Sequence, residues 1–253
     1  MTEKYFGRSG QGRIIAMWSG PRNLSTAMMR SFSARGDCDA VDEPFYAAYL
    51  QATGLEHPMR EAVIASQPTD PAEVVLQCLT APQDQNRIFY QKHMTHHMID
   101  GFDTGWLAQV TNVFLIRAPE RVLASYAAKT EQVTAADIGF LRQRELFDEV
   151  HAATGSVPAV IDATDIRRSP SAMLEKLCDA IGIAFDPAML CWPEGPHKAD
   201  GVWAAHWYDS VWRSTGFAPP EAGAPADLPD DLAAIAWEVR PHYEHLRRHA
   251  LQA

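Results

Sequence analysis

The chain has 253 residues, a length that fits one large domain with a full-sized hydrophobic core. Hydrophobic residues make up 47% of the chain and charged residues 21%, which excludes a disordered, collagen-like or coiled-coil protein. The formal net charge of -10 disfavours general binding to nucleic acid or to an anionic membrane, so a polyanionic ligand must meet a local cluster of basic residues.

The cysteines and the N-terminal segment point to a cytoplasmic protein. Cys38, Cys78, Cys178 and Cys191 are far apart and form no CxxC pair, which predicts neither a disulfide framework nor a zinc site. The first twelve residues are polar, and the apolar run after them is too short for a signal peptide core or a membrane span. We therefore expect no targeting segment.

Short apolar runs alternate along the chain with segments of helical periodicity. The expected strands are Ile14–Trp18, Arg87–Tyr90, Val113–Ile116 and Val157–Ile161, and the expected helices are Leu24–Phe32, Pro119–Lys129, Ala136–Ala153, Pro170–Ile181 and Asp230–Ala250. This alternation predicts an α/β domain with a central parallel sheet and helices on both faces. In such sheets ligands bind at the carboxyl ends of the strands.

The loop after the first expected strand is typical of an anion site. Ser19 to Thr26 lead from the strand end into a helix start, where backbone N–H groups and the helix dipole favour negative charge. Arg22, Ser25 and Thr26 add a cation and two hydroxyl donors. The pattern GxxxxGK[ST] is absent, which argues against a standard ATPase or GTPase. The alternative is a plain turn with a capping serine and a surface arginine.

A second candidate anion site follows the strand at Val113–Ile116. Arg117 comes directly after this strand, and Ser125 lies about two turns into the next helix. A guanidinium and a hydroxyl together can hold a second phosphate. Each loop alone also fits ordinary surface residues, but two such loops on one sheet are a stronger signal than either.

These segments resemble the sulfotransferases that use 3′-phosphoadenosine 5′-phosphosulfate (PAPS). Pro21-Arg22-Asn23-Leu24-Ser25-Thr26 is similar to that family's phosphate loop P-[KR]-S-G-[ST]-T, with Asn23-Leu24 in place of Ser-Gly. Arg117 and Ser125 match the family's 3′-phosphate pair in type and spacing. The similarity continues over Ile161–Ile166, and His197–Trp203 with His206 is faintly similar to the basic lid.

The resemblance implies a single P-loop-like domain over residues 1–253, with a core of about 13–185 and a C-terminal lid and helix of about 192–250. It implies a sulfotransferase that moves a sulfonate group from PAPS to a hydroxyl of a small-molecule acceptor, without a metal. The implied PAPS-binding residues are Gly20, Pro21, Arg22, Asn23, Leu24, Ser25, Thr26, Arg117, Ser125 and Lys198.

Sulfuryl transfer needs a cation near the leaving phosphate and a base for the acceptor hydroxyl. Arg22 is the candidate cation, and the base is Glu43 or His93, because each follows an apparent strand end and the family permits either. Lys92 is adjacent to His93, and a shift of one residue in an extended segment turns a side chain to the other face, which favours Glu43. We expect Lys92 to contact the sulfonate or the acceptor, and to lower the pKa of a neighbouring carboxylate.

Two other functions remain open: a small-molecule kinase that uses ATP with magnesium on an irregular phosphate loop, and a non-catalytic nucleotide-binding protein. His93, His96 and His97 have a spacing that can place metal ligands on one helical face, but no carboxylate cluster follows closely, so a metal site is the weaker interpretation. The aromatic residues within Trp192–Trp212 either line a ligand site or pack in a C-terminal core. The sequence names neither the acceptor nor the oligomeric state.

Overall fold

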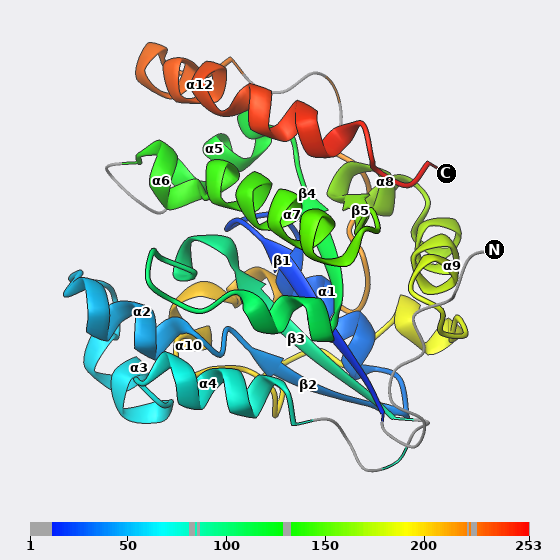
Figure 1. The fold of residues 1–253 in the computed structure, drawn as a ribbon. Coiled ribbons are helices and arrows are strands. Elements are labelled where there is room, and N and C mark those ends of the chain that lie inside the picture. Colours follow the sequence, from blue (N-terminus) through cyan, green and yellow to red (C-terminus); the bar gives the residue numbers. More distant parts are fainter. Residues whose placement is uncertain are drawn as a thin grey trace.

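The structure, a computed structural model, describes residues 12–80, 84, 87–128, 133–221, 223 and 227–252. Five strands form one parallel sheet in the order β2-β3-β1-β4-β5 (Figure 1). They are β1 (Arg13–Ser19), β2 (Cys38–Asp42), β3 (Ile88–Met94), β4 (Thr111–Ile116) and β5 (Ala159–Asp162). The predicted fold class, one α/β domain with a central parallel sheet and helices on both faces, is confirmed.

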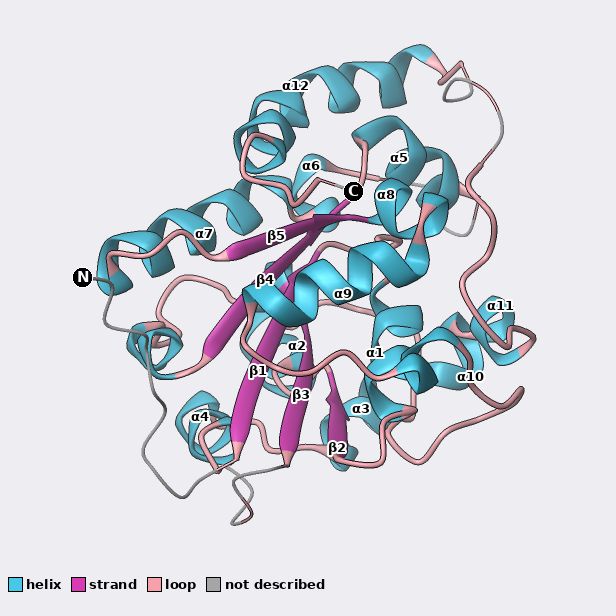
Figure 2. Ribbon diagram, turned by 90° about the vertical axis from the view of Figure 1, so that its right-hand side faces the viewer, coloured by secondary structure: helices cyan, strands magenta, loops and turns pink. Residues whose placement is uncertain are grey.

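Helices connect the strands and cover both faces of the sheet (Figures 1 and 2). They are α1 (Ser25–Ser33), α2 (Tyr46–Thr53), α3 (Arg60–Ser66), α4 (Pro71–Cys78), α5 (Pro119–Ala127), α6 (Ala135–Ile138), α7 (Phe140–Thr154), α8 (Ala163–Arg168), α9 (Pro170–Ala180), α10 (Ala204–Trp207), α11 (Asp209–Trp212) and α12 (Asp230–Arg247), with 3₁₀ turns at Thr95–His97, Gly105–Gln109 and Pro187–Leu190.

The two faces of the sheet form two separate parts of the core, because successive side chains of a strand point in opposite directions. Ile15 and Met17 of β1 belong to the part that includes residues of α1 and α9. Ala16 and Trp18 belong to the part that includes residues of α4, α7 and α12. Both faces of β1 are therefore apolar, as the continuous run in its sequence predicts.

Several elements differ from the prediction, and the helices α2, α3, α4, α8, α10 and α11 were not among those expected. A strand end was expected before Glu43, but the edge strand β2 has no range among the expected strands, because only its first and last residues are buried and it lacks a continuous apolar run. Strand β3 continues to Met94, which places His93 inside the strand and not after it. The helix expected over Ala136–Ala153 is divided at Gly139, whose φ of 67° interrupts the helix. The expected helix end at Lys129 lies outside the described residues.

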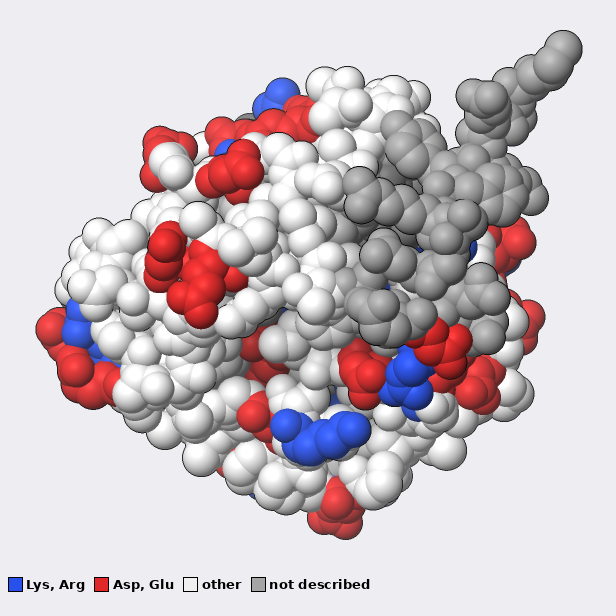
Figure 3. Space-filling view, turned by 60° about the horizontal axis from the view of Figure 1, so that its bottom comes forward, with Lys and Arg blue, Asp and Glu red and all other residues white. Residues whose placement is uncertain are grey.

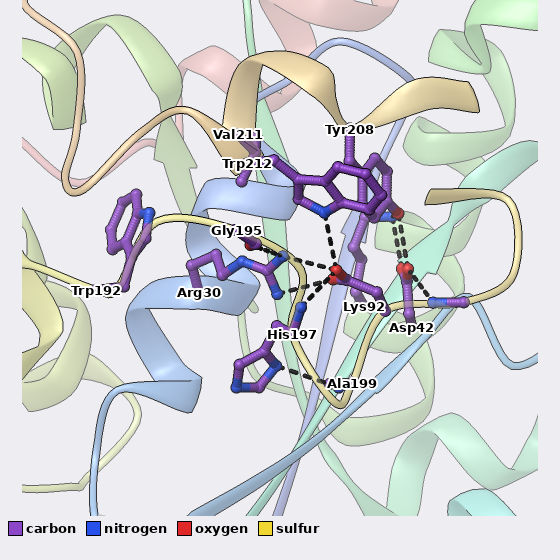
Figure 4. Close-up of polar contacts among 12 residues, drawn as sticks. Arg30, Asp42, Lys92, Trp192, Gly195, His197, Ala199, Tyr208, Val211 and Trp212 are labelled. Carbon is purple, nitrogen blue, oxygen red and sulfur yellow. Dashed lines mark hydrogen bonds and ion pairs between the residues drawn. The ribbon is translucent and has the colours of Figure 1, made fainter. Parts of the chain in front are cut away.

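A buried ion pair fixes the C-terminal segment to α1 (Figure 4). The side chains of Arg30 and Asp200 are 2% and 6% exposed, and Arg30 Nη1 lies 2.7 Å from Asp200 Oδ1. Asp200 also accepts hydrogen bonds from the backbone N–H of His197 at 2.9 Å and from Trp212 Nε1 at 3.0 Å. This one carboxylate therefore holds the chain around α10 and α11 against the helix that follows β1.

The surface carries charges of both signs in small groups. On the face in Figure 3, Lys and Arg side chains lie beside Asp and Glu, with wide uncharged areas between the groups. Surface ion pairs such as Arg87–Asp39, at 2.6 Å, join opposite charges in this way. Among the described residues, no helix combines the length and the apolar character needed to cross a bilayer.

We predict that Asp200→Ala lowers the free energy of unfolding by about 3–5 kcal/mol, because it leaves the buried Arg30 guanidinium without its partner. Urea unfolding measures this loss. Asp179→Ala, at an exposed position of α9, is the control and is expected to change the unfolding free energy by less than about 0.5 kcal/mol. Equal stability of the two variants would show that the ion pair does not hold the segment.

Candidate functional site

A cavity of about 660 Å³ lies at the carboxyl ends of the strands. One end is lined by residues of the β1–α1 loop and of the segment after β4, including Arg22, Ser25, Arg117 and Ser125. The other end is lined mainly by aromatic and histidine side chains, namely Tyr46, Tyr49, His57, His96, His97, Trp203, His206, Trp207 and Tyr208. The cavity therefore has a basic end and an aromatic end.

The backbone is strained around this cavity. Four non-glycine residues of the described chain have positive φ, and three of them, Arg22 (61°), Leu24 (75°) and Glu43 (43°), line the cavity. Left-handed backbone costs an ordinary residue on the order of 1 kcal/mol and is concentrated at functional sites. Leu24 stands where the resemblance places glycine, so the loop keeps the backbone conformation that glycine would allow without strain.

The two predicted anion loops contact each other. The Arg22 guanidinium donates through Nε to Ser125 Oγ at 2.9 Å, and Arg117 donates through Nη1 to the backbone carbonyl of Arg22 at 2.5 Å. Strands β1 and β4 are neighbours in the sheet, which brings their following loops together. Arg22, Arg117 and Ser125 thus form one basic wall.

Other residues of the predicted loop have different positions. Pro21, Leu24, Ser25 and Thr26 line the cavity, whereas Gly20 and Asn23 are not among its lining residues. A Cβ atom on Gly20 would lie 2.3 Å from the backbone carbonyl oxygen of Ile138. Gly20 therefore permits close packing of the loop on α6, which is a structural reason for glycine at this position.

Lys92 joins β3 to β2 and to the C-terminal segment (Figure 4). Its side chain is fully buried, and Nζ donates to Asp42 Oδ1 at 2.8 Å, to the Tyr208 hydroxyl at 2.7 Å and to Glu43 Oε1. Burial alone would lower the pKa of Lys92, but the Asp42 and Glu43 carboxylates raise it to about 12. Lys92 is therefore a fixed cation in the wall of the cavity.

Glu43 is a buried carboxyl group at the same wall, with 6% of its surface exposed. Burial raises its pKa to about 6, although the charge of Lys92 acts in the opposite direction. The expected effect of Lys92 is present, but burial outweighs it. Gln67 Nε2 donates to the Glu43 carbonyl at 3.2 Å, and the Glu43 N–H donates to the Lys92 carbonyl at 2.8 Å. These bonds hold the strained turn that directs the carboxyl group to Lys92.

The structure does not bring His93 and Lys198 to this cavity. His93 stacks on Trp18 with ring centroids 4.3 Å apart, and its Nε2 pairs with Gln91 Oε1 at 3.0 Å. Burial lowers the pKa of His93 to about 3. Lys198 is exposed, and neither residue is among the cavity's lining residues. His93 faces away because the side chains of Lys92 and His93 alternate along β3.

The aromatic end of the cavity carries uncharged imidazoles. His97 is stacked between Tyr46 and Tyr49, with ring centroids 4.6 Å and 4.8 Å away. Burial lowers the pKa of His96 to about 4 and that of His97 well below its ordinary value. Within the described part of the chain, no group of three or more His, Cys, Asp or Glu side chains is placed to hold a metal ion.

Several residues of the site were not among the predicted site residues. Asp42 and Tyr208 complete the surroundings of Lys92, and the Tyr208 hydroxyl donates to Asp42 Oδ2 at 2.7 Å. Arg167 and Glu221 line the basic end. The aromatic-rich sequence around Tyr208 was a general signal, but nothing in it specifies a bond to a residue 166 positions away.

Comparison with known proteins shows the family of this chain. The profile of a family described as "Sulfotransferase domain" matches residues 12–250. The chain belongs to this sulfotransferase family. Two solved structures share the fold: the sulfotransferase domain of the Synechococcus PCC 7002 olefin synthase (TM-score 0.50, 18% identity, 94% of this chain and 98% of that one) and a sulfotransferase from Alicyclobacillus acidocaldarius (TM-score 0.51, 11% identity, 97% and 98%).

Two longer plant proteins are more similar in sequence. They are the branched-chain-amino-acid aminotransferase-like proteins 2 and 1 of Arabidopsis thaliana, which are 32% and 34% identical to this sulfotransferase over 236 residues. The match covers 93% of this chain and 42% of each relative, so the chain spans less than half the length of these curated relatives.

We predict that, as the pH rises from 4.5 to 7, the free energy of unfolding of the wild-type protein falls by up to about 2 kcal/mol more than that of Glu43→Gln. The folded state binds the Glu43 proton with a pKa of about 6, against 4.5 for the ordinary group, so raising the pH favours the unfolded chain. Urea unfolding at a series of pH values measures this difference. Glu56→Gln, at an exposed position, is expected to keep the wild-type pH dependence. Parallel curves for wild type and Glu43→Gln would refute the raised pKa.

Proposed function

We propose that this protein is a PAPS-dependent sulfotransferase that transfers a sulfonate group to a hydroxyl of a small-molecule acceptor. The observation that carries the proposal is one cavity in which Arg22, Arg117 and Ser125 contact one another at one end. The buried pair of Glu43 and Lys92 lines the same cavity. A basic wall and a buried base beside a cation are what sulfuryl transfer needs.

The basic wall would hold the nucleotide. Pro21 to Thr26 would hold the 5′-phosphosulfate, and Arg117 and Ser125 the 3′-phosphate. Ser25 begins α1, so the positive end of this helix adds to the charge of Arg22 at the same place. A guanidinium group can bind a phosphate with two parallel hydrogen bonds. With two such groups, Arg22 and Arg117, the wall fits a nucleotide that carries one anion at its 5′ end and another at its 3′ position.

In the reaction, the acceptor oxygen forms a bond to sulfur while the bond from sulfur to the 5′-phosphate oxygen breaks. Glu43 takes the proton of the acceptor hydroxyl, and 3′-phosphoadenosine 5′-phosphate leaves with one more negative charge. Arg22 donates hydrogen bonds to the oxygens on which that charge develops. Lys92 keeps Glu43 ionised near neutral pH, because its charge opposes the rise in pKa that burial causes. This arrangement favours Glu43 over His93 as the base, and it assigns no step to a metal.

The aromatic end would bind the body of the acceptor. Its rings and neutral imidazoles offer flat, uncharged surfaces, which favour an acceptor with a planar or apolar part next to the reacting hydroxyl. The four free thiols fit the cytoplasmic location that we propose. The division into a core of about 13–185 and a C-terminal lid and helix of about 192–250, with Lys198 as a lid contact, stays a prediction.

We predict that Arg22→Ala lowers the turnover of PAPS by roughly 100- to 1000-fold, because it removes the donor at the leaving group. Arg117→Ala is expected to weaken binding of 3′-phosphoadenosine 5′-phosphate by roughly tenfold or more, with a smaller effect on turnover. Transfer of labelled sulfonate from PAPS to a panel of hydroxyl acceptors measures turnover, and calorimetry measures binding.

Arg87→Ala is the matched control, since Arg87 pairs with Asp39 near the amino ends of β2 and β3, and it should leave both quantities unchanged. Wild-type turnover in Arg22→Ala, or wild-type affinity in Arg117→Ala, would count against the proposal. Affinity for the nucleotide without turnover on any acceptor would favour a non-catalytic protein.

A further inference from the structure

Three arginine side chains meet a single carboxylate at the basic end of the cavity. Glu221 accepts hydrogen bonds from Arg117, from Arg121 at 2.6 Å and from Arg167 at 2.6 Å. Arg117 and Arg167 share Oε1, and Arg121 bonds Oε2. Both oxygens of one carboxylate are thus engaged by charged donors from three places in the sequence.

The arginines come from two neighbouring strands. Arg117 follows β4, Arg121 lies four residues further in α5, and Arg167 lies in α8, directly after β5. Positions 117, 121 and 125 are spaced by four, so Arg121 lies on the face of α5 that presents Ser125. Because β4 and β5 are adjacent, α8 brings Arg167 to the same place.

The charges of this cluster do not balance. Three guanidinium groups carry three positive charges, and Glu221 supplies one negative charge. Burial lowers the pKa of Arg117; Glu221 opposes this effect, while Arg167 and Arg121 add to it by repulsion. Arg167 Nε is also buried without a hydrogen-bond partner in the described part of the chain. The cluster therefore suits an anion with more charge and more oxygens than a carboxylate.

We propose that Arg121 and Arg167 join Arg117 in binding a phosphate monoester, and that Glu221 occupies this site until the phosphate displaces it. A phosphate monoester carries nearly two negative charges and three acceptor oxygens, which match three guanidinium groups better than one carboxylate does. This inference rests on the proposed function, because it takes the phosphate to be the 3′-phosphate of the nucleotide. Glu221 is about one-third exposed, so it can leave the site without unpacking the core.

The test is calorimetric titration with 3′-phosphoadenosine 5′-phosphate, 5′-AMP and inorganic phosphate. Glu221→Gln should bind the first of these roughly tenfold more tightly than wild type, because a competing anion is gone, and bind 5′-AMP unchanged. Arg121→Ala and Arg167→Ala should each bind it roughly tenfold more weakly, again with 5′-AMP unchanged. If an alanine variant does not fold, Arg121→Lys or Arg167→Lys takes its place in the titration. The control Glu194→Gln, which removes the same charge from an exposed position, should match wild type.

Unchanged affinity for 3′-phosphoadenosine 5′-phosphate in Glu221→Gln, or in both arginine variants, would overturn the inference. An equal gain in affinity for 5′-AMP in Glu221→Gln would do the same, because it would show a general charge effect. If wild type does not bind 3′-phosphoadenosine 5′-phosphate, the proposed function fails. The titration with inorganic phosphate then tests whether the anion site exists. Tighter phosphate binding by Glu221→Gln than by wild type would keep the anion site, and equal binding would reject it.

Discussion

The buried ammonium group of Lys92 must have charged partners, because a lone ammonium group inside a protein would lose its proton or unfold the surrounding chain. The carboxylates of Asp42 and Glu43 meet this need, and the neutral hydroxyl of Tyr208 accepts a further hydrogen bond from Lys92. These partners come from the end of β2, the turn after it and the C-terminal segment. One charge therefore joins β3, the end of β2 with the turn after it, and the C-terminal segment, and one of its partners is the proposed base.

The same constraint explains the strain at Glu43. A left-handed turn costs about 1 kcal/mol for a residue other than glycine, and burial of the carboxyl group adds to the cost at neutral pH. The charge of Lys92 offsets part of the cost of burying the carboxylate. Gln67 Nε2 holds the turn by donating hydrogen bonds to the backbone carbonyls of Asp42 and Glu43. A buried base with a pKa near 6 is ionised at neutral pH and can still receive a proton, which suits general base catalysis.

The basic end follows from sheet order. Strands β1, β4 and β5 lie side by side, so the arginines that follow them converge without any long-range signal in the sequence. Crowded guanidinium groups repel one another, and the Glu221 carboxylate, which pairs with three of them, reduces this repulsion. The cavity thus has a basic end and an end lined mainly by aromatic and histidine side chains.

Short-range patterns in the sequence predicted much of the fold and part of the candidate site. The apolar run of β1, the loop from Pro21 to Thr26 and the spacing of Arg117 and Ser125 are short-range features, and they were readable from the sequence. The extent of the edge strand β2 and the break at Gly139 were not readable, because partial burial and a single left-handed residue leave weak patterns. The bonds that bring Glu221 and Tyr208 into the site could not be predicted, since their partners lie more than 50 residues away in the sequence.

The central claim is that the cavity recognises a nucleotide by its 3′-phosphate, and a thermal-shift titration of the wild-type protein tests it most directly. Ligands that bind only the folded state raise the melting temperature, by an amount that grows with the logarithm of their concentration relative to the dissociation constant. We expect 3′-phosphoadenosine 5′-phosphate to raise it by several degrees more than 5′-AMP or ADP with magnesium at equal concentration. A shift with ADP and magnesium, and none that requires the 3′-phosphate, would contradict the account and favour a kinase.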